Sequence, residues 1–219
     1  MTCSPIFCTP CFAVVIIKKK KKPNFAYNMK TQLEIEIEKM MSGQLYDANY
    51  NDQLLPLLEA TSEKCWEYNH LLRPSQVAER EALLRGLLGK TGKRFKINQP
   101  FYCDYGFNIE IGEDFFANFN LVILDEAKVK IGDHVYIAPN CGLYTAGHPL
   151  DVDRRNAGME YSLPITVGNN VWMGAGVHVM PGVTIGDNTV IGAGSIVVHD
   201  IPAGVLAVGN PCRPVRKIH

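Results

Sequence analysis

Residues 165–197 read ITVGNNVWMGAGVHVMPGVTIGDNTVIGAGSIV, and this stretch repeats with a period of six residues. The first set of repeated positions is aliphatic or methionine: Val167, Met173, Val179, Ile185, Ile191 and Val197. The second set, four residues after each of these, is small or β-branched: Val171, Val177, Val183, Thr189, Ser195 and Ile201. An α-helix repeats its apolar residues about every 3.6 positions and a two-faced strand about every two, so neither explains the pattern. A period of six predicts short strands joined by corners and coiled into a parallel β-helix.

The same period is present earlier in the chain, but it is interrupted. Ile111, Ala117, Ile123 and Val129 lie six apart, and the phase then shifts by two before Ile131, Ile137 and Leu143 continue it. Residues 145–163 are rich in Gly, His, Pro and Arg and lack the period altogether. We predict that they form a loop that leaves the coil, and long loops in compact domains are usually functional or disordered.

The chain before the repeats has helical features. We predict a helix over 31–46, a second that begins at Asp52, and a third that begins after Pro74-Ser75 and ends at Gly89. The predicted organisation is therefore an N-terminal helical segment over 29–97 and a β-helix over 98–219, with the ejected loop 145–163 and a closing segment at the C-terminus. Residues 1–28 are interpreted as a disordered or mis-annotated extension.

Composition excludes several classes of partner and places the protein in a reducing compartment. Lys+Arg and Asp+Glu balance at 22 each, which gives no electrostatic case for nucleic-acid binding. The apolar run 5–17 is too short to span a membrane, and a peripheral contact through lysines 18–22 is the alternative. Cys8-x-x-Cys11 lacks a second pair of ligands, so we predict no metal site. The scattered cysteines indicate a cytoplasmic protein.

One histidine stands apart from the other five. His148 lies in the loop 145–163, whereas His178 lies in the regular run and is expected to point outward into solvent. An imidazole with a pKa near 6.5 is suited to removing a proton from an alcohol at neutral pH. Its second nitrogen needs an orienting partner, for which Glu160, Asp151, Asp153 and a backbone carbonyl are candidates. The alternative is an ordinary surface histidine.

Other polar and aromatic residues admit two interpretations each. Trp172 alternates with inward positions, so it is predicted to face away from the core, as a subunit contact or a platform for a ligand. Four polar residues lie among apolar neighbours in the early coils and are either corner formers or hydroxyl binders: Asp104, Asn118, Asp125 and Glu126. Arg213 and Arg216 are suited to binding phosphate, or they belong to a solvated tail.

Several stretches together resemble the sugar O-acetyltransferases of the hexapeptide-repeat superfamily, which include maltose, galactoside and nodulation acetyltransferases. They are 41–46 (MSGQLY), 104–109 (DYGFNI), 116–120 (FANFN), 147–149 (GHP), 164–172 (PITVGNNVW), 181–188 (PGVTIGDN) and 209–213 (GNPCR). The resemblance covers residues 31–217. Because the repeats alone would identify only the superfamily, the N-terminal helices and the histidine loop narrow the resemblance to this branch.

The resemblance implies a left-handed parallel β-helix and a homotrimer with active sites between subunits. It implies transfer of acetyl from acetyl-CoA to a sugar hydroxyl, with His148 as general base, Glu160 beside it, and no metal. Residues implied to contact the acceptor are Asp47, Asp104, Asn118 and Glu126, with Trp172 as a further candidate. Residues implied to contact the coenzyme are Ala175, Ala193, Val198, His199, Arg213 and Arg216. At Val198 and His199 the family often has Thr and Lys, so phosphate binding is expected to differ there.

Three alternatives remain open at this point. A serine or xenobiotic acetyltransferase shares the coil and the imidazole base but lacks these N-terminal helices. A metal-dependent lyase of the β-helical carbonic anhydrase type needs three histidines on zinc, and the His-x-x-x-x-His pair of those enzymes is absent here. A non-catalytic β-helix would have kept the coil and lost the activity.

Overall fold

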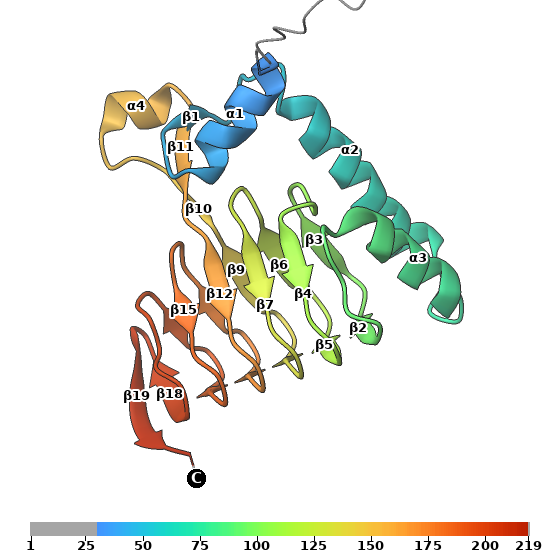
Figure 1. The fold of residues 1–219 in the computed structure, drawn as a ribbon, viewed down its shortest axis with the longest axis vertical. Helices are drawn as coiled ribbons and strands as arrows, with labels where there is room; N and C mark the ends of the chain where they lie inside the picture. The colour runs from blue at the N-terminus through green and yellow to red at the C-terminus, as the bar shows by residue number, and fades with distance from the viewer. Residues whose placement is uncertain (1–29, 219) are drawn as a thin grey trace, which may run out of the picture.

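The computed structural model describes residues 30–218, in which three sheets of parallel strands form the walls of a β-helix (Figure 1). The first wall contains β4 (Ile109–Ile111), β7 (Val129–Ile131), β12 (Ile165–Val167) and β15 (Thr184–Ile185). The second wall contains β2 (Phe95–Ile97), β5 (Phe115–Ala117), β8 (Tyr136–Ile137), β13 (Trp172–Met173), β16 (Val190–Ile191) and β18 (Val205–Gly209). The third wall contains β3 (Phe101–Cys103), β6 (Leu121–Leu124), β9 (Gly142–Tyr144), β14 (His178–Val179) and β17 (Ile196–Val197). The predicted parallel β-helix is confirmed.

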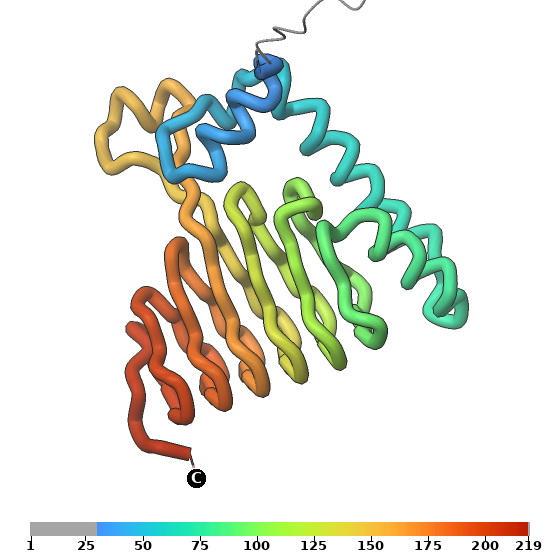
Figure 2. The backbone as a smooth tube through the Cα atoms, in the orientation of Figure 1, coloured from blue at the N-terminus to red at the C-terminus, as the bar shows by residue number. Residues whose placement is uncertain are grey.

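Register between neighbouring strands explains why the period shifts in the early coils. In the late coils Thr166 pairs with Thr184, eighteen positions further on, which is three repeats of six. In the early coils Phe116 pairs with Tyr136, twenty positions further on. Each early coil therefore carries two residues more than a regular one, and these residues produce the shift. Figure 2 shows the coils stacked side by side along the axis.

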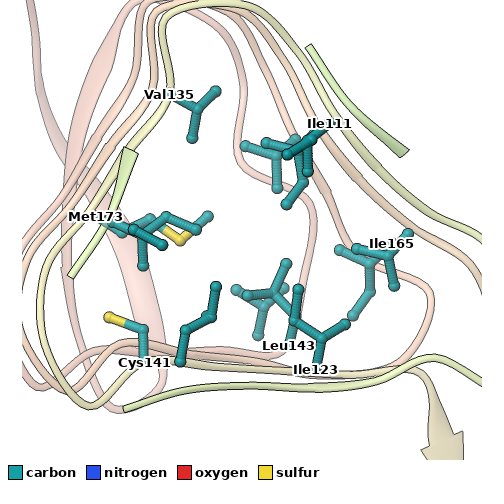
Figure 3. Close-up of a cluster of buried hydrophobic side chains, with 14 of the residues drawn as sticks. Ile111, Ile123, Val135, Cys141, Leu143, Ile165 and Met173 are labelled. Atoms are coloured by element: carbon teal, nitrogen blue, oxygen red, sulfur yellow. The ribbon is translucent and has the colours of Figure 1, made fainter. Parts of the chain in front are cut away.

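Side chains at the repeated positions fill the inside of the coil, as the period predicts. Every member of both sets and of the early series is at most 4% exposed. Figure 3 shows such residues, among them Ile111, Leu143 and Met173, pointing inward from different walls. Burial of apolar area stabilises the fold by roughly 25 cal/mol per Å², and each coil obtains this burial from its neighbours. Thr189 and Ser195 are buried with their hydroxyls paired, because both donate hydrogen bonds to backbone carbonyls within the coil.

Three helices precede the coil, and two of their limits differ from the prediction. Helix α1 (Gln32–Met41) begins with a capping box between Thr31 and Glu34 and ends well before residue 46, because Gly43 has a positive φ of 75°. Helix α2 (Leu55–Trp66) begins after Asp52, and Asn51 rather than Asp52 accepts backbone N–H groups before it.

Beyond α2, the π-helix η1 (Glu67–Leu71) extends the same segment, and α3 (Val77–Leu87) follows Pro74-Ser75 as predicted. Tyr68 and Asn69 donate hydrogen bonds to carbonyls of Ile97 and Phe101, which fixes the helical segment to the first coil. The first strand of the coil, β2, begins at Phe95, three residues before the predicted boundary at 98.

The segment 145–163 does leave the coil, but it has regular structure of its own. It contains β10 (Ala146–Gly147), helix α4 (Val152–Asn156) and β11 (Met159–Ser162). Strand β11 pairs with β10 and also with β1 (Tyr46–Asp47), which follows α1. Figure 1 shows this excursion beside α1, at the end of the molecule away from the last coils. The excursion is therefore held by the N-terminal segment.

The last strand, β19 (Cys212–Lys217), pairs antiparallel with β18 and closes the coil. Four cysteines of the described residues are buried free thiols, as predicted: Cys65, Cys103, Cys141 and Cys212. Within residues 30–218, no helix is both long enough and apolar enough to cross a membrane. The predictions for residues 1–28, including Cys8 and Cys11, lie outside the described residues.

Candidate active site

His148 follows β10 directly, at the start of the excursion. Its side chain is half exposed, and its Nδ1 lies 3.3 Å from the carbonyl oxygen of Met159 on β11. Its Nε2 lies 3.4 Å from Oε1 of Glu160, the next residue of the same strand. The antiparallel pairing of β10 with β11 therefore places the imidazole against two groups that are more than ten residues away in sequence.

Glu160 lies between the histidine and the N-terminal segment. Its Oε2 accepts a hydrogen bond of 2.9 Å from the hydroxyl of Tyr46 on β1, which pairs with it across the sheet. Burial raises the pKa of Tyr46, and the nearby Glu160 and Glu126 carboxyls raise it further, so this phenol stays protonated and remains a donor. The Glu160 carboxylate is thus oriented from one side and faces His148 with its other oxygen.

A second acidic group lies at a corner of the early coils. Glu126 is 6% exposed, and burial raises its pKa to about 9, with contributions from a hydrogen bond to Asp104 and from the charges of Asp104 and Glu160. At neutral pH Glu126 is therefore protonated and can donate to the Asp104 carboxylate. The hydroxyl of Thr145 lies 3.1 Å from Glu126 Oε2. Asp104 and Glu126 thus lie together next to Thr145, the first residue of the excursion.

Asp125 is a corner former, although it neighbours this pair. It is fully buried and accepts hydrogen bonds from the backbone N–H groups of Tyr105 at 2.8 Å and Asp104 at 3.1 Å. Burial raises its pKa, and the backbone donors oppose that effect. Its bonds fix the Asp104 backbone, so Asp125 positions a candidate residue without facing the site.

Asn118 and Asp47 are not linked to these groups by side-chain contacts. The Asn118 side chain accepts from the backbone N–H of Phe119 at 2.8 Å, and that of Asp47 accepts from Tyr50 at 2.9 Å. Neither forms a hydrogen bond or ion pair with Glu126 or Glu160 within residues 30–218. Their contact with an acceptor stays a prediction.

Trp172 faces outward from the second wall, as predicted, and is 55% exposed. It pairs in register with Tyr136, which pairs in turn with Phe116, so three aromatic residues form a row across three coils. The Phe116 and Tyr136 ring centroids lie 6.5 Å apart. His178, by contrast, is not solvated as predicted, because it is half-buried and its Nδ1 lies 3.0 Å from the hydroxyl of Tyr144.

The candidate coenzyme contacts lie on the late coils. Ala175 and Ala193 are exposed at the same corner of consecutive coils, where the N–H of Gly194 donates to the Ala175 carbonyl at 2.8 Å. A Cβ on Gly174 would come within 2.6 Å of the Ala193 nitrogen, so the backbones approach closely there. The other four candidates are also exposed: Val198, His199, Arg213 and Arg216. Their contact with a coenzyme stays a prediction.

Two residues of the site were missed by the sequence analysis. Thr145 had a signal, because it lies two positions after the inward Leu143 and the strand alternation predicts that it also points inward; it is fully buried. No pattern in the sequence indicates the role of Tyr46, because its hydrogen bond to Glu160 joins residues 114 positions apart. Among the described residues, no three His, Cys, Asp or Glu side chains form a group that could hold a metal ion.

Known proteins match both parts of this architecture. The maltose acetyltransferase hexapeptide capping motif matches residues 39–92, and the bacterial transferase hexapeptide family of six repeats matches residues 164–199. The galactoside O-acetyltransferase of Escherichia coli K12 is 52% identical over 154 residues, which is 70% of this chain and 75% of that protein. The chain belongs to the hexapeptide-repeat acetyltransferases.

Solved structures of such acetyltransferases match this one closely. A maltose O-acetyltransferase from Clostridium difficile 630 superposes with a TM-score of 0.82 at 48% identity, over 84% of this chain and 97% of that chain. A galactoside acetyltransferase in complex with coenzyme A superposes with a TM-score of 0.80 at 46% identity, over 84% of this chain and 91% of that chain. The capping-motif match spans the end of α1 through α3, so both the cap and the coil of this hexapeptide-repeat acetyltransferase are shared with its relatives.

Proposed function

We propose that this hexapeptide-repeat acetyltransferase transfers acetyl from acetyl-CoA to a hydroxyl of a sugar, with His148 as the general base. The observation that carries the proposal is the placement of the imidazole between the Met159 carbonyl and Glu160. The names of the relatives, a galactoside and a maltose acetyltransferase, support the reaction class. The coenzyme A complex of one relative supports the donor.

The contacts of His148 define how the proton moves. When Nδ1–H donates to the Met159 carbonyl, the lone pair lies on Nε2, which is the nitrogen that faces Glu160. An acceptor hydroxyl bound there gives its proton to Nε2 while its oxygen attacks the thioester carbonyl. The C–S bond then breaks, and the departing thiolate takes the proton from the imidazolium, which yields an acetyl ester and free coenzyme A. Such base catalysis is typically worth about 10²–10⁴ in rate.

Acceptor binding uses the acidic groups near the base. Carboxyl oxygens accept hydrogen bonds from sugar hydroxyls, and Asp104 offers them here, whereas the protonated Glu126 donates to Asp104. We assign Asn118 and Asp47 to the rim of the same acceptor site. Trp172 is assigned to the neighbouring wall as an aromatic platform.

Acetyl-CoA binding is assigned to the late coils. The small side chains of Ala175 and Ala193 leave a corner free for the pantetheine arm. Arg213 and Arg216 on β19 carry the charge that suits the phosphates. Val198 and His199 complete the contact surface in place of the Thr and Lys often found in relatives.

A homotrimer is the proposed assembly, with each active site shared between neighbouring copies. The row formed by the partly buried Phe116 and the exposed Tyr136 and Trp172 supports this, because a contiguous aromatic surface usually marks an interface or a ligand site. Light scattering coupled to size exclusion measures the copy number. The buried free thiols fit a reducing compartment, and we place the reaction in the cytoplasm.

The test is release of coenzyme A thiol from acetyl-CoA with a panel of sugars, serine and aromatic hydroxyl compounds as acceptors. We expect turnover with at least one sugar and a loss of about 10²–10⁴ in kcat for His148→Ala. His134→Ala is the matched control, because His134 is an exposed corner histidine beside Asp114 and should keep full activity. Wild-type turnover in His148→Ala would refute the assignment of the base, and turnover with serine or xenobiotics alone would refute the sugar.

A further inference from the structure

A cavity between the helical segment and the third wall shares only Asp104 with the reaction described so far. It has a volume of about 510 Å³ and lies where α2 packs against β3. Its lining comprises Leu58, Glu59, Ser62, Cys65, Trp66, His70, Tyr102, Cys103 and Asp104. This volume is within the range of small-ligand pockets, which is roughly 300–1,000 Å³. The cavity is large enough for a sugar ring.

Exposed aromatic rings line this cavity from two elements. Trp66, at the end of α2, is 51% exposed and stacks on His70, with ring centroids 5.4 Å apart and planes inclined by 24°. The Nδ1 of His70 lies 3.0 Å from the Trp66 carbonyl, so the stacked pair is fixed to the helix. Tyr102 projects outward from β3 and is 41% exposed. Flat aromatic faces with polar edges suit the apolar face and hydroxyl rim of a pyranose.

Charge in the cavity selects a neutral ligand that carries hydroxyl donors. The lining includes two carboxyl residues, Glu59 and Asp104, and no lysine or arginine. Carboxylates accept hydrogen bonds from hydroxyl groups and repel phosphates, so this surface does not suit the coenzyme.

Asp104 connects the cavity with the candidate active site. It lines the cavity and is also hydrogen-bonded to Glu126, the buried acid next to Thr145. A ligand that contacts Asp104 from the acceptor site therefore has space beyond that residue, toward Trp66 and Tyr102. Of the residues that line the cavity, the proposed function uses Asp104 alone.

We propose that the Trp66–His70–Tyr102 cavity binds the second pyranose ring of an oligosaccharide acceptor, while the first ring occupies the acceptor site. This inference rests on the proposed function, because it assumes a sugar acceptor at Asp104. The cavity then sets the preference for disaccharides over single sugars, and stacking on Trp66 supplies much of that preference.

The test measures binding by calorimetry, without acetyl-CoA, on the full-length protein. The probes are maltose, cellobiose and lactose, each compared with the methyl glycoside of its non-reducing ring. We expect at least one disaccharide to bind about fivefold more tightly than its methyl glycoside. This gain should be lost in Trp66→Ala and in Tyr102→Ala and kept in Trp66→Phe, which retains an aromatic face. Val77→Ala, a change at an exposed apolar residue on α3 outside the cavity, is the control and should keep the gain.

Two results would overturn the inference: no disaccharide binds better than its methyl glycoside, or the gain persists in both alanine variants. Thiol release measured on the same preparations separates this failure from that of the proposed function. If methyl glycosides are acetylated but no disaccharide binds more tightly than its methyl glycoside, the second-ring site is refuted and the proposed acetyl transfer stands. If a disaccharide binds more tightly than its methyl glycoside only when Trp66 is present, and no sugar is acetylated, the sugar-binding role of the cavity stands and the proposed acetyl transfer is refuted.

Discussion

The late coils and the early coils share the same three walls but differ in what their corners contain. From β12 to β17 the register of the late coils advances by eighteen residues, and the buried hydroxyls of Thr189 and Ser195 are satisfied by backbone groups within the coil. In the early coils it advances by twenty, and the corner after β6 buries two acids, Asp125 and Glu126. The late coils satisfy their buried polar groups within the coil, whereas the early coils bury acidic side chains near His148 and Glu160.

The difference shows how a repetitive fold acquires a site. A strict six-residue repeat leaves no place for a group that needs an unusual partner, because every inward position must pack against the same position in the next coil. Two additional residues per early coil form a wider corner, and the whole excursion enters between β9 and β12. Glu126 and His148 both lie at such departures from the period.

The largest effect is expected from a substitution that disrupts the packing inside the coil. Ile185→Asp places an ionisable group at a fully buried position of β15 and should lower the free energy of unfolding by ~4 kcal/mol or more, because no partner is present inside the coil. Its neighbour Thr184 is exposed on the same strand, so Thr184→Asp should change stability by less than about 0.5 kcal/mol. Chemical denaturation of both variants measures the contrast. Equal effects would mean that the strand does not alternate inward and outward.

The second prediction concerns the acid buried in the early coils. With a folded pKa of about 9 against an ordinary 4.5, Glu126 keeps its proton in the folded state while the unfolded chain releases it. Stability is therefore unaffected below pH 4.5, falls as pH rises toward 9, and is constant above that. Glu126→Gln remains neutral and can still donate to Asp104, so its advantage over wild type should grow by ~1 kcal/mol per pH unit between these limits.

Denaturation at pH 5, 6.5 and 8 measures this slope, and a surface acid provides a control of opposite sign. Hydrogen bonds from the backbone N–H groups of Lys93 and Arg94 lower the pKa of Glu113. Its favourable contribution is present above the unfolded pKa and lost on acidification, so Glu113→Gln should be less stable than wild type at neutral pH and approach it in acid. A flat difference for Glu126→Gln would show that this acid is ionised in the folded protein.

The third prediction sharpens the role of the excursion. If Glu160 stabilises the imidazolium that forms when Nε2 of His148 takes the proton, Glu160→Gln should lower kcat about 10-fold with little change in the KM of the acceptor, because the opposite charge next to the imidazolium is lost. Tyr46→Phe removes only the bond that holds Glu160 and should have a smaller effect in the same direction. Steady-state kinetics with varied acceptor measures both. A raised KM with unchanged kcat would instead make Glu160 an acceptor contact.

Structural features that follow the six-residue period, or interrupt it, could be predicted from the sequence, whereas features that depend on single residues or on distant contacts could not. The inward positions, the outward Trp172 and the excursion follow from the period, because each repeats or interrupts a spacing. The end of α1 and the start of α2 were predicted wrongly, since single residues such as Gly43 and Asn51 decide them. The contact of Tyr46 with Glu160 joins distant segments, and no local pattern encodes it.

The smallest expected effect tests whether the corners of the two regions are alike. Asn188 and Asn140 both have positive φ, 54° and 61°, and each accepts from an asparagine of the preceding coil, Asn170 at 3.0 Å and Asn120 at 2.9 Å. Alanine at either position should cost ~1 kcal/mol, because alanine lacks the side-chain amide that helps asparagine tolerate the left-handed region and because the side-chain bond is lost; glycine, which has no Cβ, should cost less. Thermal unfolding of the four variants measures these costs. Asn140 lies at a corner between the second and third walls, and Asn188 lies at a corner between the first and second walls. Neither corner contains the additional residues, which follow β6, so we expect Asn140→Ala and Asn188→Ala to agree within about 0.5 kcal/mol. A cost at Asn188 alone would mean that the additional residues also relax the corner at Asn140.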